Sequence, residues 1–247
     1  MSVEVDADRV EQARAVMLEL FPAGFEEVDR GGPTELVAYT DAGGEERLWQ
    51  AFGGAAAADV QAGWEDRWRD FHRPVRIGRL WVGPPWETAP DGAIPVVIDP
   101  GRAFGTGSHA TTRLCLELLL ELERGSLLDI GCGSGVLAIA AAKLGFDPVA
   151  GLDVEEAAVE ATHANAAAND VVVSATRVDA SAAPLPAVDV TVANIALATV
   201  EALAPRVRSR RVVTSGYLAA ERPSLDGLRH LERRAADGWA ADLFERR

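Results

Sequence analysis

Three glycines alternate with other residues directly after an apolar run, in the sequence LLDIGCGSG of residues 127–135. The apolar run predicts a buried strand, and the apolar residues that follow Gly135 predict a helix. Glycine lets the backbone turn tightly and bring its N–H groups against a ligand, and the N-terminus of a helix favours a negative group such as a carboxylate. We therefore expect this segment to bind a cofactor.

An acidic residue follows at a spacing that suits a nucleotide cofactor. Asp153 ends the next predicted strand, 18 residues after Gly135 (153 − 135), and a carboxylate there can accept hydrogen bonds from both hydroxyls of a ribose. The string G-x-G-x-x-A from Gly133 to Ala138 formally satisfies the dinucleotide pattern. However, Asp129 stands two residues before the first glycine of D-x-G-x-G-x-G, a form that looks like the S-adenosylmethionine loop of class I methyltransferases. S-adenosyl-L-methionine is therefore the favoured cofactor, and a dinucleotide is the alternative.

Two further segments carry polar groups that chemistry could use. Residues 98–112, IDPGRAFGTGSHATT, are rich in glycine and hydroxyl groups and include Phe104 and His109. A linker would not need an aromatic residue and a histidine among its glycines, whereas a loop that folds over a ligand would. Asn194 ends a β-branched strand and stands at the carboxyl edge of the predicted sheet, where open α/β folds place their sites. An isolated asparagine at a strand end is more often a turn residue, but its order after the glycine segment and Asp153 favours a site.

The elements that must position these residues begin near Ile94, where apolar strands start to alternate with helical stretches. The expected strands are 96–99, 127–130, 149–153, 171–178, 189–193 and 212–215, and the expected helices are 111–123, 134–144, 155–169 and 199–207. Such alternation predicts βαβ units and a parallel sheet covered on both faces. Residues 229–236 and 239–244, joined by Asp237-Gly238, predict an antiparallel hairpin that closes the sheet edge. The predicted fold class is α/β and Rossmann-like.

The rest of the chain predicts a small domain and a connector. Residues 1–60 predict an α+β domain, with extended pieces at 2–5, 25–28, 35–40 and 55–60 and helices at 8–20 and 45–52. Residues 61–92 predict a linker with a helix, because Trp64, Trp68 and Phe71 have helical spacing, followed by a strand at 75–82. Residues 93–247 are predicted to form the domain that carries the candidate site.

Charge and composition limit the partners and the compartment. The formal net charge is −14, from 24 Lys and Arg against 38 Asp and Glu, so a basic protein suits this chain better than RNA or DNA. No apolar run reaches the roughly 18–20 residues that span a membrane, and the acidic N-terminus has no apolar signal segment. Cys115 and Cys132 cannot by themselves form a disulfide framework or a zinc site. We expect a cytoplasmic protein that binds neither metal nor membrane.

Taken together, the motifs are very similar to those of the PrmA family of bacterial methyltransferases, whose substrate is large-subunit ribosomal protein L11. The strings DPGRAFGTGSHATT (99–112), DIGCGSGVLAIAA (129–141) and VANI (192–195) carry this resemblance, which is dense from about residue 64 to 218. It implies an N-terminal ferredoxin-like domain that recognises the substrate, a helical linker, a C-terminal methyltransferase domain and a monomer. The positions that match the family's cofactor-binding residues are Thr112, Gly131, Asp153 and Asn194, with Asp129, Gly133 and Gly135 in the same glycine segment and Phe104, Gly105, Thr106, Gly107 and His109 in a covering loop.

Methyl transfer from a sulfonium to an amine needs alignment and desolvation more than a dedicated strong base. We expect Asn194 to offer its side-chain carbonyl to the acceptor amine, with Thr106 or His109 completing the pocket. The family usually reads Asn-Ile-Leu-Ala where this chain has Asn194-Ile195-Ala196-Leu197, a change that leaves Asn194 in place. Three alternatives stay open: a related enzyme acting on another protein's lysines, a dinucleotide-dependent oxidoreductase, and a binding module without catalysis.

Overall fold

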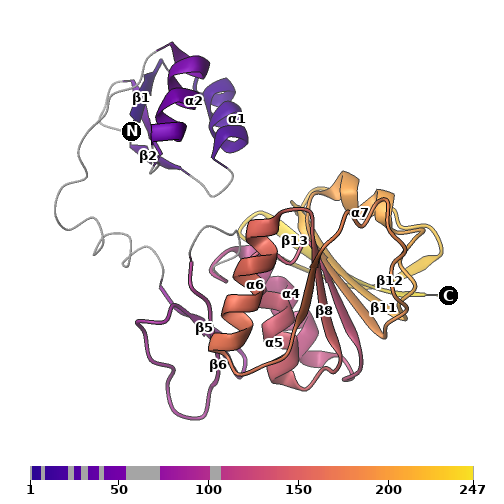
Figure 1. Ribbon diagram of the computed structural model, residues 1–247. Helices are drawn as coiled ribbons and strands as arrows, with labels where there is room; N and C mark the ends of the chain where they lie inside the picture. Colours follow the sequence, from indigo (N-terminus) through magenta and orange to yellow (C-terminus); the bar gives the residue numbers. More distant parts are fainter. Residues whose placement is uncertain are drawn as a thin grey trace. The chain divides into compact units, whose positions relative to one another are not determined.

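The computed structural model describes residues 2–6, 9–21, 25–28, 33–38, 42–53, 73–100 and 107–246. The chain divides into two compact units, Met1–Trp68 and Arg69–Arg247 (Figure 1).

The first unit contains a small antiparallel sheet and two helices. Its elements are β1 (Ser2–Val5), α1 (Val10–Leu20), β2 (Glu26–Val28), β3 (Thr34–Val37) and α2 (Ala42–Phe52), with strand order β1-β3-β2. Met17, Leu36 and Leu48 are fully buried between the helices and the sheet. These elements agree with the expected α+β unit. The extended piece expected at 55–60 lies outside the described residues, so the ferredoxin-like architecture stays a prediction.

The second unit is built on a mixed sheet of seven strands. Its strands are β7 (Leu127–Ile130), β8 (Val149–Asp153), β9 (Ser174–Arg177), β10 (Val190–Asn194), β11 (Arg211–Leu218), β12 (Leu228–Ala236) and β13 (Trp239–Arg246), and its helices are α4 (Ala110–Glu121), α5 (Val136–Leu144), α6 (Glu156–Ala168) and α7 (Leu197–Leu203). The order is β12-β13-β11-β10-β7-β8-β9, and the five strands from β11 to β9 are parallel. The predicted Rossmann-like class is confirmed.

The hairpin at the end of the chain is also confirmed. β13 pairs antiparallel with β11 on one side and with β12 on the other, so β12 forms the edge of the sheet. The turn between them has positive φ at Asp237 (53°) and Gly238 (80°), as the two-residue turn that fits the twist of paired strands requires.

Helices cover both faces of this sheet, which explains why its central strands β7 and β10 are buried along their length (Figure 1). Successive strand side chains point to opposite faces, so Leu127 packs in a core with α4 and α5, whereas Leu128 packs in a second core with α7. The same alternation separates Val213 from Val212. Because helices pack on both faces of the sheet, a ligand can bind only where the strands end.

A separate three-stranded sheet precedes α4. It consists of β4 (Val75–Ile77), β5 (Leu80–Gly83) and β6 (Ile94–Val97) in the order β4-β5-β6. The single strand expected at 75–82 is therefore a hairpin, which turns at Gly78 with φ of 55°. Apolar side chains of these strands share the core of α4 and α5, so part of the predicted linker packs with the second unit. The helix expected around Trp64 lies outside the described residues, and the three-part domain division stays a prediction.

Candidate functional site

The predicted site residues meet at one edge of the seven-stranded sheet. Ile130 pairs with Leu152 of β8 and with Ala193 of β10, and all three strands are parallel. The carboxyl ends of parallel strands meet at the same edge, so Gly131, Asp153 and Asn194 come together there. Open α/β folds bind their ligands at this edge.

The glycine segment forms a tight turn between β7 and α5. Gly131, Gly133 and Gly135 have φ angles of 76°, 53° and 82°, a region that side chains other than glycine rarely adopt. A Cβ atom at Gly131 would overlap Cγ2 of Ile195, and one at Gly135 would lie 2.9 Å from Cγ2 of Thr162. Glycine is therefore needed at both positions for conformation and for space.

Asp153 is held against this turn by two hydrogen bonds. Its Oδ2 accepts from the backbone N–H of Gly133 at 2.9 Å, and its Oδ1 accepts from the N–H of Glu155 at 3.1 Å. A carboxylate oxygen has more than one lone pair, so each oxygen retains capacity for a hydroxyl donor. The next residue, Val154, is 58% exposed and offers an apolar surface beside the carboxylate.

Asp129 lies beneath the turn and is 1% exposed. Its Oδ2 accepts from the N–H of Ala138 at 3.2 Å, and its Oδ1 has no hydrogen-bond partner among the described residues. Burial raises the pKa of Asp129 to about 7, the Ala138 hydrogen bond opposes this shift, and the negative charge of Asp153 adds to it. The sequence predicted that Asp129 belongs to the cofactor-binding residues. In the structure its carboxylate is buried and accepts a hydrogen bond from the first turn of α5.

The burial of Asp129 predicts that the free energy of unfolding depends on pH. The pKa of Asp129 is about 7 in the folded protein and 3.8 ordinarily, so between these values the folded state binds more protons, and the free energy of unfolding falls as pH rises. Replacing Asp129 with Asn removes the charge, so we expect Asp129→Asn to unfold at higher temperature than the parent at pH 8 but not at pH 4. The predicted gain is on the order of 1–4 kcal/mol.

Thermal unfolding of the cofactor-free chain at several pH values measures this effect. Asp226→Asn, which neutralises an exposed carboxylate of the same unit, is the control. A parent and an Asp129→Asn variant with parallel pH profiles would show that Asp129 titrates normally.

Asn194 is oriented by two threonines at the start of α4. Its Nδ2 donates to Oγ1 of Thr111 at 3.2 Å and to Oγ1 of Thr112 at 3.5 Å, and both threonines are buried. Because Nδ2 faces the hydroxyl groups, the carbonyl oxygen Oδ1 points away from them. This amide orientation is assigned from the hydrogen bonds.

His109 supports Thr111 from the other side. Its Nδ1 lies 2.7 Å from Oγ1 of Thr111 and accepts from the Thr111 N–H at 3.4 Å, which makes His109 the N-cap of α4. Since Nδ1 accepts from that N–H, the Thr111 hydroxyl donates to it as well. Burial lowers the pKa of His109, and the nearby charge of Arg113 lowers it further, so His109 is neutral at pH 7. Its ring makes a T-shaped contact with the ring of Trp239, at a centroid distance of 4.9 Å.

Three of the predicted residues, Phe104, Gly105 and Thr106, lie outside the described residues. Gly107 is described, with φ of 88°, and a Cβ atom there would overlap Cγ1 of Val82 and lie 3.7 Å from Cγ2 of Val136. Gly107 therefore packs between β5 and the start of α5.

Sequence reasoning missed two asparagines one turn apart, Asn165 on α6 and Asn169 at its C-cap. Asn165 accepts from the N–H of Asp99 at 3.0 Å and donates to the carbonyl of Ser134 at 2.9 Å. Asn169 accepts from the N–H of Val97 at 2.8 Å and donates to its carbonyl at 2.6 Å. Through these bonds α6 ties the end of β6 to the glycine turn. Their i, i+4 spacing was the available signal, but an amide pair on a helix is usually solvated.

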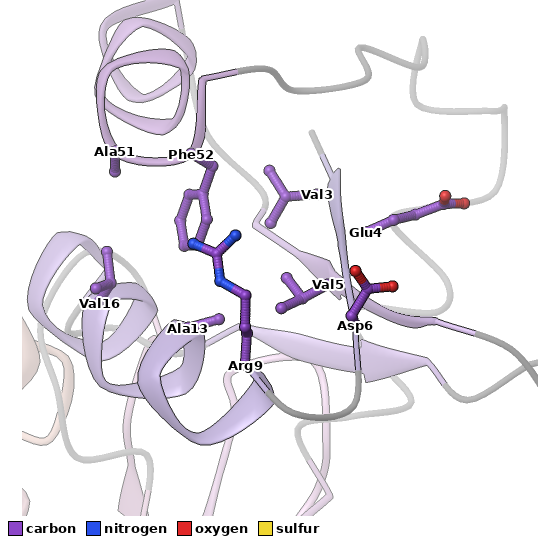
Figure 2. Close-up of a pocket in the computed structure, with 9 residues that line it drawn as sticks. All are labelled: Val3, Glu4, Val5, Asp6, Arg9, Ala13, Val16, Ala51 and Phe52. Atoms are coloured by element: carbon purple, nitrogen blue, oxygen red, sulfur yellow. The ribbon is translucent and has the colours of Figure 1, made fainter.

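The first unit contains a pocket of a different kind (Figure 2). Its lining residues are Val3, Glu4, Val5, Asp6, Arg9, Ala13, Val16, Ala51 and Phe52, and none of them was predicted to do chemistry. Across the described ranges, no cluster of three or more His, Cys, Asp or Glu side chains could hold a metal ion. Within those ranges no helix has both the length and the apolar character needed to cross a membrane.

Comparisons with known proteins identify the family. The family model described as "Ribosomal protein L11 methyltransferase (PrmA)" matches residues 44–221. Ribosomal protein L11 methyltransferases from Shewanella sp. (strain ANA-3) and Legionella pneumophila (strain Lens) are 46% and 39% identical to this chain over 167 and 195 residues. These matches cover 63% and 73% of this chain and 55% and 68% of the relatives. The chain thus spans about half the length of the Shewanella relative.

Solved structures give the same result for the fold. Ribosomal protein L11 methylase from Lactobacillus delbrueckii subsp. bulgaricus is 26% identical, with a TM-score of 0.64 over 71% of this chain and 100% of that one. A Pyrococcus abyssi tRNA (uracil-54, C5)-methyltransferase in complex with S-adenosyl-L-homocysteine shares the fold at 20% identity, with a TM-score of 0.50 over 70% of this chain and 43% of that one.

Proposed function

Because the chain belongs to the ribosomal protein L11 methyltransferase (PrmA) family, we propose that it transfers methyl groups from S-adenosyl-L-methionine to amines of ribosomal protein L11. The acceptors are lysine side chains, the N-terminal amine or both. The observation that carries the proposal is the meeting of the glycine turn, Asp153 and Asn194 at one sheet edge. This edge combines a nucleoside site with an oriented amide.

The residues at this edge fit S-adenosylmethionine. The carboxylate of Asp153 would accept from the ribose hydroxyls, and the exposed side chain of Val154 suits one face of the adenine. The glycine turn and the start of α5 would bind the methionine carboxylate, because backbone N–H groups and the helix dipole favour an anion there. Gly131, Gly133, Gly135 and Thr112 complete this site, and Asp129 supports the turn from below. Phe104, Gly105, Thr106 and Gly107 would cover it.

The acceptor amine must be neutral to attack. The cofactor supplies a methyl group on a sulfonium, which is already activated. Deprotonating an unperturbed lysine at pH 7 costs about 4–5 kcal/mol, and an α-amine costs about 1 kcal/mol. A nearby cation and a dry pocket both lower the pKa of an amine. Both effects reduce the free energy needed to deprotonate the acceptor, so the proposed mechanism uses no dedicated strong base.

The chain's own residues then aim the amine. Asn194 accepts a hydrogen bond from the acceptor N–H through Oδ1, because its Nδ2 is engaged by Thr111 and Thr112. Because the N–H points to Asn194, the nitrogen lone pair is directed away from Asn194 and is available to attack the methyl group. His109, with its Nδ1 committed to Thr111, or Thr106 would complete the walls of the pocket. Alignment of this kind can supply several kcal/mol of the barrier reduction.

The partner we propose is a basic protein, bound by a monomer in the cytoplasm and without direct contact to nucleic acid. The net charge of −14 attracts a lysine-rich surface over distances comparable to the Debye length, which is about 8 Å at physiological ionic strength. The first unit is the proposed recognition domain.

Ionic strength should therefore affect the two substrates differently. We expect the KM for L11 to rise about three- to tenfold between roughly 50 and 300 mM NaCl, because salt screens the attraction between unlike charges. The KM for S-adenosylmethionine should change less than about twofold, because its contacts are local. Steady-state kinetics at fixed pH measure both, and potassium glutamate in place of chloride controls for anion effects. Equal salt dependence of the two KM values would contradict charge-guided recognition.

Calorimetry and mass spectrometry test the function itself. The purified chain is titrated with S-adenosylmethionine and with NAD, and recombinant L11 is weighed after incubation with enzyme and cofactor. We expect cofactor binding and mass gains in steps of about 14 Da, one per methyl group. Binding without a mass gain would move the acceptor to another protein. Binding of NAD alone would support the oxidoreductase, and no binding of either would support a module without catalysis.

A further inference from the structure

Another close glycine contact lies within β11, next to the end of β10, where Asn194 stands. Gly216 has φ of 99° and sits where the pairing of β11 with β13 shifts register, between Ser215 and Tyr217. A Cβ atom at Gly216 would lie 2.7 Å from the carbonyl carbon of Ile195 and 2.9 Å from its nitrogen, and closer still to its oxygen. Only glycine lets the two backbones approach this closely.

The side chain of Ile195 contacts the glycine turn, because its Cγ2 is the atom that a Cβ at Gly131 would overlap. On the side of β11, the N–H of Ile195 donates to the carbonyl of Ser215 at 3.1 Å. The residue after Asn194 is therefore held between two glycines, with its backbone against Gly216 and its side chain against Gly131. Both glycines have positive φ, so neither contact survives an ordinary substitution unchanged.

We infer that Gly216 is a positioning residue, which sets the place of the Asn194 carboxamide relative to the glycine turn. Gly216 itself faces the backbone of Ile195 and acts through it, since Asn194 is bonded directly to Ile195. The inference rests on the proposed function, because it assigns Asn194 to the acceptor amine. A Cβ at position 216 would push the Asn194–Ile195 turn aside, and reacting groups tolerate displacements of only about 1 Å.

The chain offers a matched control for the strain of an alanine at positive φ. Gly145 ends α5 with φ of 96°, and a Cβ atom there would meet nothing within 4 Å. It also lies at the opposite edge of the sheet, because α5 runs back from the carboxyl end of β7 toward the start of β8. Gly145→Ala and Gly216→Ala therefore share the backbone penalty, and only the second displaces Ile195.

The experiment compares steady-state kinetics and thermal unfolding of the two variants. We expect Gly216→Ala to lower kcat about tenfold relative to Gly145→Ala, with the KM for L11 changed less than about twofold and kcat measured well below both melting temperatures. Equal kcat values for the two variants would overturn the inference.

A second readout separates this inference from the proposed function. The side-chain amide resonances of Asn194, assigned by their loss in Asn194→Ala, should shift in Gly216→Ala and stay in place in Gly145→Ala. If the parent methylates nothing, the proposed function fails, while these resonances still report whether Gly216 positions Asn194. Should Gly216→Ala not fold, the double variant Gly216→Ala with Ile195→Ala frees the side chain of residue 195 from Gly131, so that the turn can move away from position 216. Asn194 resonances in this double variant that match those of Ile195→Ala alone would also overturn the inference.

Discussion

Asn194→Ala is expected to lower kcat by about 100- to 1,000-fold, the loss typical of removing one preorganised polar group at a reacting centre. The side-chain amide is oriented by its Nδ2, which donates to Thr111 and Thr112 at 3.2 and 3.5 Å, so that Oδ1 faces the other way. Alanine removes the oxygen that aims the acceptor. It also leaves two buried hydroxyls without this donor, so the affinity for S-adenosylmethionine should weaken as well.

The measurement is single-turnover methyl transfer at saturating cofactor, with calorimetry of S-adenosylhomocysteine to report the binding loss. Asn194→Asp keeps an acceptor oxygen but removes the donor to Thr111, so we expect an intermediate rate. Thr199→Ala, an exposed position in α7, is the neighbouring control. Near-normal turnover of Asn194→Ala would remove Asn194 from the mechanism.

Asp153→Ala is expected to raise the Kd for S-adenosylmethionine about 100-fold or more. Two hydrogen bonds from ribose hydroxyls to a carboxylate are each worth roughly 1.5–3 kcal/mol, and about 1.4 kcal/mol corresponds to a tenfold change in Kd. The variant also loses the bond from Asp153 to the N–H of Gly133 at 2.9 Å, so the glycine turn loses a support. At saturating cofactor, kcat should fall only a fewfold, because Asp153 lies away from the transferred methyl.

Calorimetry with S-adenosylmethionine gives this Kd directly. Asp153→Asn retains one acceptor oxygen and should lose affinity by about tenfold. Glu155→Ala removes the same charge from an exposed side chain two residues away and should leave the Kd unchanged. A Kd in Asp153→Ala close to that of Glu155→Ala would mean that the ribose binds elsewhere.

Much of the fold could be predicted because its signals are local. The apolar runs at 127–130 and 149–153 match β7 and β8 in full, and the Asp237-Gly238 dipeptide forms the predicted hairpin turn. Predictions that depended on less local features were wrong or incomplete. The strand expected at 75–82 is two strands, because a single glycine, Gly78, reverses the chain within an apolar stretch.

The candidate site divides in the same way. The sequence by itself determined which residue types follow β7, β8 and β10, since glycine spacing, an acid and an amide can be read along the chain. Only the tertiary structure decided what surrounds them. Thr111 orients Asn194 from a helix 83 residues away, Asn165 joins segments 66 and 31 residues distant, and Gly216 presses on Ile195 from the next strand. Such contacts depend on the register of the strands and on how closely two backbone segments approach each other. Both are set when the two faces of the sheet pack, and neither produces a periodic pattern in the sequence.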